Sequence, residues 1–114
     1  MKLKIGSRVV DDVNILDLSG EMILGEECRT LRKTLKDLIE TNHQKILLNM
    51  EDVTRIDTTG LGVLVSTFGD MNNRQGNMKL LNLTHRMHTI LVITKLITIF
   101  EVFDNQEAAV KSFQ

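Results

Sequence analysis

The residues most suited to chemistry lie together near the middle of the chain. Thr58 and Thr59 place two hydroxyl groups directly after Asp57, and glycines follow at positions 60 and 62. The flanking pattern predicts that a buried strand leads into a helix at this segment. The first turn of a helix leaves backbone N–H groups unpaired, and these attract anions, including a phosphate bound covalently to a nearby hydroxyl. The segment is therefore a candidate for a modified hydroxyl group.

A simpler role for the same residues is to cap the helix. Any of Asp57, Thr58 and Thr59 could accept a hydrogen bond at its start, and N-cap residues generally stabilise a helix by about 1 kcal/mol. The glycines argue for more than capping, because Gly60 and Gly62 each cost up to ~1 kcal/mol relative to alanine within a helix. A missing side chain lets the backbone of another protein approach. We therefore predict that the start of this helix is a docking surface.

The hydrophobic pattern predicts an α/β fold. Helices are expected where apolar residues recur every three or four positions, and strands where they alternate or form short runs. The expected strands cover 2–10, 13–18, 45–50, 78–83 and 97–102, and the expected helices cover 25–41, 58–73, 84–93 and 105–112, with a polar connection over 52–57. This order predicts a mixed sheet of about four or five strands covered by about four helices. Residues 1–114 are expected to form one such domain.

The composition narrows the choice of partners. The 114 residues carry a net charge of −1 and show no clustered basic face, so we expect no nucleic acid partner. Aromatic residues make up only 4% of the chain, which also argues against stacking on bases. The single cysteine, Cys28, and the lack of a signal peptide or membrane-spanning stretch favour a cytoplasmic protein without membrane insertion.

No group of residues predicts a metal site or a familiar catalytic machinery. His85 and His88 are three positions apart on an expected helix, but no third ligand is spaced to complete a metal site. A phosphohistidine carrier is conceivable for this pair, although exposed or capping positions are the default for them and for His43. The chain has no G-x-S-x-G nucleophile elbow and no Walker-type or dinucleotide-binding glycine loop. We therefore expect neither enzymatic activity nor a cofactor.

The hydroxyl segment resembles the motif of a known family. Residues 57–62 read Asp-Thr-Thr-Gly-Leu-Gly, which is similar to the Asp-Ser-Ser/Thr-Gly-Leu-Gly motif of STAS-domain anti-sigma factor antagonists. Further similarities at 19–21, 80–83, 93–96 and 99–103 spread the resemblance over nearly the whole chain. The resemblance implies a STAS-like fold and a role in bacterial transcription regulation through protein–protein contacts.

In that family, a partner kinase that is also the anti-sigma factor phosphorylates the hydroxyl residue after the aspartate. The unphosphorylated antagonist binds this kinase and frees the sigma factor, the phosphorylated form does not bind it, and a phosphatase resets the cycle. For this chain, the resemblance implies Thr58 as the phosphoacceptor, with Thr59 as the second choice. It also implies an anti-sigma factor/protein kinase and a cognate phosphatase as partners.

Three positions depart from the family pattern. Thr58 stands where serine is commoner, Ile23 stands where an aspartate is often found, and Lys95 stands where a glycine is common. We expect Lys95 to end the third helix in a slightly strained left-handed cap. Ile23 lies in an apolar run with Met22 and Leu24, of which one or two are expected to belong to the core. The predicted docking surface comprises Asp57, Gly60, Leu61, Gly62, Met22 and Ile23.

These departures leave two alternatives to the switch. A constitutive STAS adaptor or scaffold subunit of a signalling or transporter complex would account for Thr58 together with the missing aspartate at position 23. A small nucleotide-binding or phosphocarrier enzyme is the third hypothesis, because some members of the family bind nucleotide near the motif. Weak nucleotide binding at the start of the second helix therefore stays an open expectation.

Overall fold

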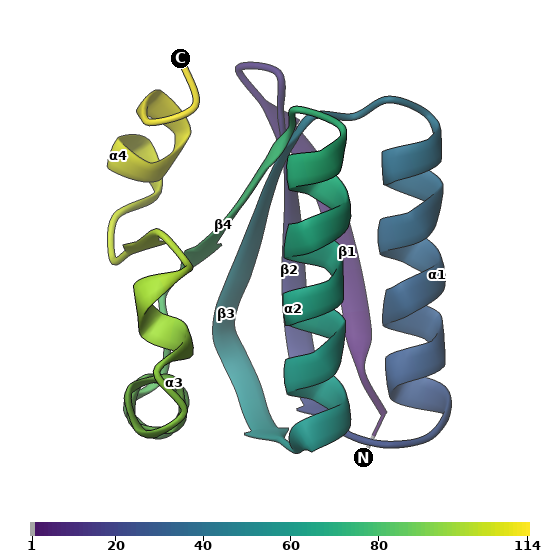
Figure 1. Ribbon diagram of the computed structural model, residues 1–114, viewed down its shortest axis with the longest axis vertical. Coiled ribbons are helices and arrows are strands. Elements are labelled where there is room, and N and C mark those ends of the chain that lie inside the picture. The colour runs from purple at the N-terminus through teal and green to yellow at the C-terminus, as the bar shows by residue number, and fades with distance from the viewer. Residues whose placement is uncertain (1) are drawn as a thin grey trace.

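The computed structural model describes residues 2–114 and shows a five-stranded mixed sheet with helices on both faces (Figure 1). The strands are β1 (Lys4–Val10), β2 (Val13–Met22), β3 (Lys45–Ile56), β4 (Asn77–Leu81) and β5 (Val102–Phe103). The helices are α1 (Glu26–Glu40), α2 (Thr58–Asn73), α3 (His85–Ile93) and α4 (Gln106–Lys111), and a short 3-10 helix, η1 (Leu96–Thr98), follows α3. The predicted fold class is confirmed.

The strands lie in the sheet in the same order as in the chain. β1 and β2 form an antiparallel hairpin, whose turn residues Asp11 and Asp12 have positive φ angles of 47° and 69°. Turns of this kind match the twist of the two strands that they connect. β2, β3, β4 and β5 are parallel neighbours. Their carboxyl ends therefore point the same way, toward the end of the sheet where α2 and α3 begin.

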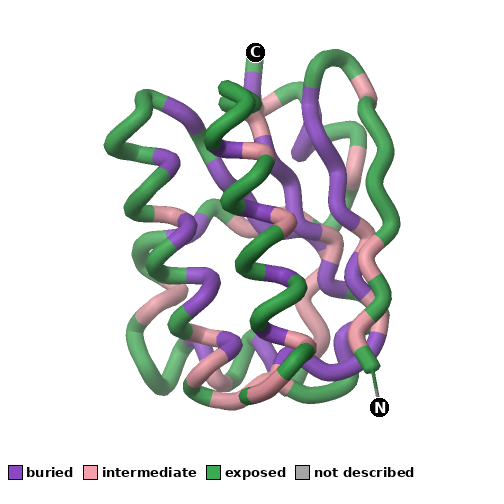
Figure 2. Tube along the Cα trace, turned by 90° about the vertical axis from the view of Figure 1, so that its right-hand side faces the viewer, coloured by how far each residue is buried: buried purple, intermediate pink, exposed green. Residues whose placement is uncertain are grey.

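The hydrophobic core has two parts, one on each face of the sheet. In β3, Ile46 and Leu48 pack with α1, α2 and α3 on one face, whereas Leu47 packs with α4 on the other. Successive side chains of a strand point to opposite faces, so this short apolar run is buried on both sides. Figure 2 shows the result, with continuous buried segments in the strands and alternating buried and exposed positions along the helices.

The predicted helices are confirmed, with their ends displaced by no more than a few residues. α2 begins and ends at the expected residues, and α1 buries Cys28, Leu31, Leu35 and Ile39 on the face that its spacing predicted. Thr84 caps α3 and Asn105 caps α4, each through a side-chain oxygen. No helix within residues 2–114 is long and apolar enough to cross a membrane.

The expected strands are less accurate. The expected connection over 52–57 is wrong, because β3 continues to Ile56 and pairs with the end of β2 beyond two shifts in register. Its exposed polar residues are compatible with a strand because only one face of this part is covered. The strand expected over 97–102 is also wrong for most of its length. Lys95 turns the chain into η1, and only Val102 and Phe103 pair with β4.

Candidate functional site

Asp57 joins three parts of the molecule at the start of α2. Its Oδ1 accepts a hydrogen bond from the backbone N–H of Gly60 (3.0 Å), which caps the helix. Its Oδ2 accepts one from the N–H of Leu24, in the loop between β2 and α1 (2.8 Å). The N–H of Asp57 itself donates to the carbonyl of Met22 (3.3 Å). The bonds from Leu24 and from Gly60 lower the pKa of the Asp57 carboxyl below its usual value.

Capping by Asp57 leaves both threonine hydroxyls free of this task. Thr58 is exposed in the first turn of α2, and its hydroxyl has no hydrogen-bond partner within residues 2–114. Thr59 is half-buried in the next position. Of the two oxygens, the one on Thr58 is therefore easier for another protein to reach.

The two glycines after the threonines have different surroundings. Gly60 is buried, and a Cβ atom there would overlap the carbonyl oxygen of Met22 and lie 2.8 Å from Cγ1 of Ile56. Gly62 is exposed, and nothing lies within 4 Å of the position that its Cβ would occupy. The prediction that both glycines serve docking is wrong for Gly60, which the internal packing requires. Only Gly62 is open to a partner.

The loop before α1 also differs from the prediction. Met22 is fully buried (0% exposed), so its place in the docking surface is wrong and it belongs to the core. Ile23 is half-buried. Leu24, which the predicted surface omitted, is 74% exposed and is bonded through its N–H to Asp57. Gly25 directly precedes α1 and has a φ angle of 122°, and Leu24 lies in the turn before it. A glycine in the sequence indicates such a turn but does not indicate which of the preceding apolar residues is exposed.

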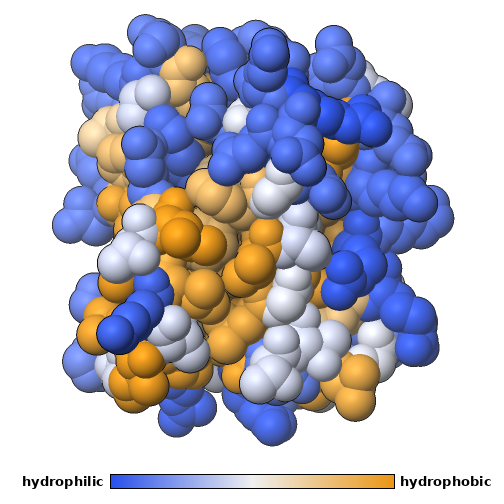
Figure 3. All heavy atoms as spheres, in the orientation of Figure 1, coloured by the Kyte–Doolittle hydropathy of each residue, from blue (hydrophilic) through white to orange (hydrophobic). Residues whose placement is uncertain are grey.

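A second apolar surface lies at the end of α3. Val92, Ile93 and Ile99, together the apolar patch, are 48%, 75% and 39% exposed. Figure 3 shows apolar atoms gathered between α3 and α2, beside a paler stripe that follows α2. Leu61, on the first turn of α2, is half-buried and packs against the core below. Exposed apolar area of this kind often marks a contact with another protein.

Lys95 separates α3 from η1. It has a left-handed conformation, with a φ angle of 64°, as the comparison with the family's glycine predicted. Its N–H donates to the carbonyl of Val92 (3.1 Å), which closes the end of the helix. The turn at Lys95 leads directly into η1, whose C-cap is Ile99.

The histidines lie apart from this region. His85 and His88 are exposed on α3, and Nδ1 of His43 lies 2.8 Å from the hydroxyl of Thr41. Across the described part of the chain, no three histidine, cysteine or acidic side chains converge in a way that would hold a metal ion.

The sequence and fold can now be compared with those of known proteins. The STAS domain family matches residues 4–109, and the chain belongs to this family. Its relatives include a putative anti-sigma factor antagonist homolog of Thermotoga neapolitana, which is 30% identical over 94% of this chain and 95% of that protein. The anti-sigma-B factor antagonist of Bacillus subtilis is 35% identical over 71% of this chain and 73% of that protein.

Solved structures agree with this assignment. The crystal structure of a putative anti-sigma factor antagonist from Thermotoga maritima has a TM-score of 0.90, at 26% identity over 96% of this chain and 93% of that chain. The Bacillus cell fate determinant SpoIIAA in its phosphorylated form has a TM-score of 0.76, at 18% identity over 98% of this chain and 99% of that chain. The latter similarity supports the fold alone.

Proposed function

We propose that this protein is a phosphorylation-controlled anti-sigma factor antagonist. Its unmodified form binds an anti-sigma factor that is also a serine/threonine kinase, and phosphorylation of Thr58 releases that partner. Thr58 is exposed at the start of α2, and its hydroxyl has no hydrogen-bond partner within residues 2–114. This observation carries the proposal. The anti-sigma factor antagonists among the relatives support the kind of partner.

The surface around Thr58 has the properties of a contact region. Gly62 lies about one helical turn further along α2 and leaves open space for a partner's backbone. Leu24 is held beside Asp57 and is largely exposed. Burying a side chain of this size contributes roughly 1.5–3 kcal/mol. A group added to Thr58 would therefore lie within the contact rather than at its margin.

Phosphorylation would change the charge of this surface without refolding the protein. A phosphate on Thr58 adds about −1.5 to −2 charges. The nearby N-terminus of α2 stabilises such an anion by about 0.3–1 kcal/mol, so the modified state is tolerated within the fold. In the complex, the same charge would have to lose its water without a matching cation, which is unfavourable. A loss of 1.4 kcal/mol at the interface already weakens binding about tenfold.

The phosphoacceptor is tested by incubating the protein with its cognate kinase and ATP. We expect mass spectrometry to find one phosphate per chain, on Thr58. Thr58→Ala should abolish labelling, Thr58→Ser should restore it, and the matched control Thr59→Ala should be labelled like the wild type. Labelling that persists on Thr58→Ala and disappears on Thr59→Ala would move the acceptor to Thr59.

The release step needs a separate binding measurement. Calorimetry should show that the phosphorylated protein binds the anti-sigma factor at least tenfold more weakly than the unmodified protein. Leu24→Ser and Ile93→Ser should each weaken binding of the unmodified form, whereas a substitution on the far side of α1, such as Lys33→Ser, should not. Equal affinities of the phosphorylated and unmodified forms would refute the switch.

A constitutive adaptor is the second candidate function. It is favoured by Ile23, an apolar and half-buried residue where antagonists of the family often carry an aspartate. Affinity purification of the tagged protein from its own cells separates the two ideas. Recovery of scaffold or transporter subunits without a kinase would support the adaptor, whereas recovery of a kinase would support the switch.

A further inference from the structure

A concave region lies away from Thr58, at the carboxyl ends of β4 and β5. Its volume is about 760 Å³, and its walls come from the segment that follows β4, the start of α3, and β5 with the residue that follows it. Glu51 of β3 completes the lining. None of the lining residues belongs to the surface that we propose for the anti-sigma factor. Ligands in α/β folds gather at the carboxyl ends of parallel strands, so this cavity is placed where a ligand is expected.

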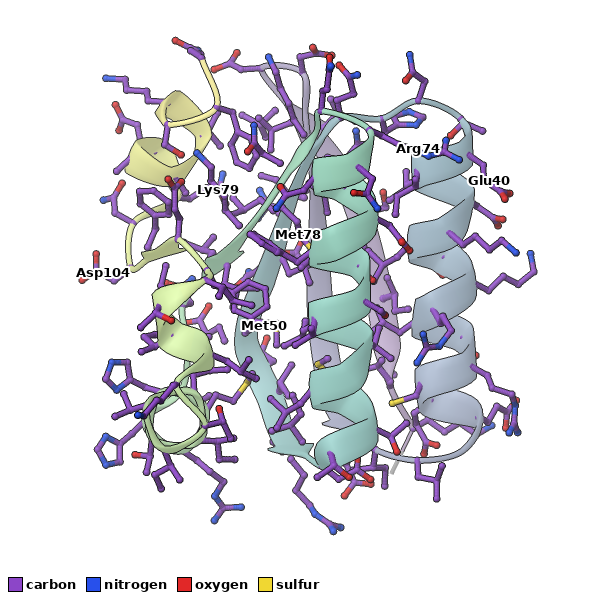
Figure 4. All side chains as sticks on the ribbon, in the orientation of Figure 1. Glu40, Met50, Arg74, Met78, Lys79 and Asp104 are labelled. Carbon is purple, nitrogen blue, oxygen red and sulfur yellow. The ribbon has the colours of Figure 1, made fainter. Side chains whose placement is uncertain are left out.

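The charges around the cavity are of one sign. Glu51 and Asp104 are exposed carboxylates, and neither has an ion pair or a side-chain hydrogen bond within residues 2–114. The lining contains no lysine or arginine among the residues that the structure describes. Figure 4 shows Asp104 projecting outward from the segment between β5 and α4, and this residue is part of the lining of the region. The cavity is therefore arranged to attract a cation.

Asn82 adds a positioned acceptor to these carboxylates. Its backbone is held in the left-handed region, with a φ angle of 58°, and its N–H donates to the carbonyl of Phe103 (2.8 Å). Its side-chain nitrogen donates to Oδ1 of Asn49 (3.3 Å), and Asn49 in turn donates to Asp17 (2.8 Å). These bonds use the amide nitrogen of Asn82 and leave its side-chain oxygen available. That oxygen can accept a hydrogen bond from a ligand N–H group.

Part of the remaining wall is apolar and includes an aromatic residue, whereas its polar part consists of Thr84, His85 and His88. Phe103 lines the cavity together with Val102 and Leu83. An aromatic face favours the alkyl part and the charged end of an organic cation. The Lys79 ammonium lies 6.0 Å from the centre of the same ring, but Glu101 compensates its charge at 2.7 Å. Phe103 is half-buried and is one of the lining residues, so part of this residue is open to a ligand in the cavity.

The start of α3 also borders the cavity, and a helix N-terminus favours anions. This effect opposes the attraction of cations by Glu51 and Asp104. A helix N-terminus corresponds to about half a positive charge, and Thr84 already accepts a hydrogen bond from the N–H of Met87 there (3.2 Å). Two full negative charges, on Glu51 and Asp104, oppose this partial charge. The net field therefore selects a cation and disfavours phosphates and carboxylates.

We propose that this cavity binds the guanidinium or ammonium end of an alkyl chain. The two carboxylates attract the charge, the side-chain oxygen of Asn82 accepts an N–H, and the Phe103 wall contacts the alkyl part. Such a group can come from an arginine or lysine side chain of a bound protein or from a free polyamine. The proposal is independent of the proposed function, because it uses none of the residues around Thr58.

The test is an NMR titration of the ¹⁵N-labelled full chain with three probes. N-acetyl-arginine amide represents a protein side chain, spermidine represents a free polyamine, and N-acetyl-citrulline amide has nearly the shape of the arginine probe without its charge. We expect saturable shifts at Asn82, Leu83, His85 and Phe103 with at least one cationic probe and none with citrulline. The tighter of the two cationic probes identifies the source. Added salt should weaken binding, because the charges lie near the surface.

Variants make the result specific to this cavity. The double variant Glu51→Gln/Asp104→Asn should weaken binding of the cationic probe at least tenfold, and both changes are at exposed positions that leave the fold intact. The matched control Glu40→Gln removes a carboxylate from α1, on the side of the molecule opposite Asp104 in Figure 4, and should bind normally. Shifts that fail to saturate, that citrulline reproduces, or that the double variant retains would overturn the proposal. Phosphorylation of Thr58 by the kinase should be unchanged in the double variant, so failure of one proposal is distinguishable from failure of the other.

Discussion

α2 and α3 both begin after a parallel strand, and a threonine stands at the start of each, but the two threonines have different tasks. At α3, Thr84 is itself the cap, because its hydroxyl accepts the N–H of Met87. At α2, the carboxylate of Asp57 is the cap, and the hydroxyl of Thr58 forms no hydrogen bond with the described residues 2–114. In these two helices, the threonine hydroxyl at the helix start is engaged where it is the cap and is free of that task where Asp57 is the cap.

The largest expected effect is the difference in stability between alanine variants of Gly60 and Gly62 in α2. Gly60→Ala should destabilise the protein by roughly 1–3 kcal/mol, because the added methyl group collides with the carbonyl of Met22 and with Ile56. Gly62→Ala should be neutral or stabilising by up to ~1 kcal/mol, since its methyl group enters open space in a helix. Urea unfolding of both variants measures the difference. Equal destabilisation would show that the first turn of α2 is not held against β2 in this way.

Urea unfolding should also distinguish alanine variants of the two threonines, Thr84 and Thr58, by their free energies of unfolding. Thr84→Ala should cost about 1 kcal/mol, because it removes the cap of α3. Thr58→Ala should change the free energy of unfolding by less than about 0.5 kcal/mol, as expected for a surface position without bonds. A clear loss of stability in Thr58→Ala would mean that this hydroxyl has a structural role and would weaken its assignment as a free acceptor.

At the end of α3, we expect a substitution to stabilise the protein, and by a smaller amount than the losses above. Lys95 is held at a positive φ angle of 64°, a conformation that glycine adopts without strain. Lys95→Gly should therefore raise the free energy of unfolding by up to ~1 kcal/mol. Lys36→Gly, in the middle of α1, is the matched control and should lower it by a similar amount. Destabilisation by both changes would contradict the cap geometry.

The smallest expected effect is the dependence of the free energy of unfolding on acidic pH through Asp57. The pKa of Asp57 is lowered in the folded protein by the N–H groups of Leu24 and Gly60. The unfolded chain therefore takes up this proton more readily, and the stabilisation is complete above the ordinary aspartate pKa of about 4. It is lost as the pH falls through the lowered value. Asp57→Asn keeps a capping side chain and should lose less stability than the wild type between about pH 6 and pH 3 in urea unfolding.

Local patterns in the sequence predicted the helices well and the contacts between distant segments poorly. The spacing of Leu31, Leu35 and Ile39 is a property of one helix, so the sequence alone indicates which face is buried. The second half of β3 is a strand because the end of β2 lies beside it, and no local pattern contains that information. The η1 turn after Lys95 similarly depends on how α3 packs.

The residues of the candidate site also fall into those that the sequence indicated and those that only the structure revealed. Residue types at the start of a helix indicated that Asp57 or one of the two threonines after it is the cap, and the structure shows that Asp57 is the cap and that Thr58 is exposed. The role of Thr58 as a phosphoacceptor stays a prediction. The reason for Gly60 lies in the carbonyl of Met22, which is remote in sequence. Leu24 was overlooked because a run of three apolar residues gives no indication of which one turns outward.

The close approach of Gly60 to Met22 has a consequence for how a signal can leave this protein. The first turn of α2 has no slack against β2, since even a methyl group does not fit between them. Close packing at this turn opposes sliding or tilting of the helix against β2, because any such movement toward the strand meets the carbonyl of Met22. We therefore expect a modification of Thr58 to be detected by a binding partner that contacts this turn directly.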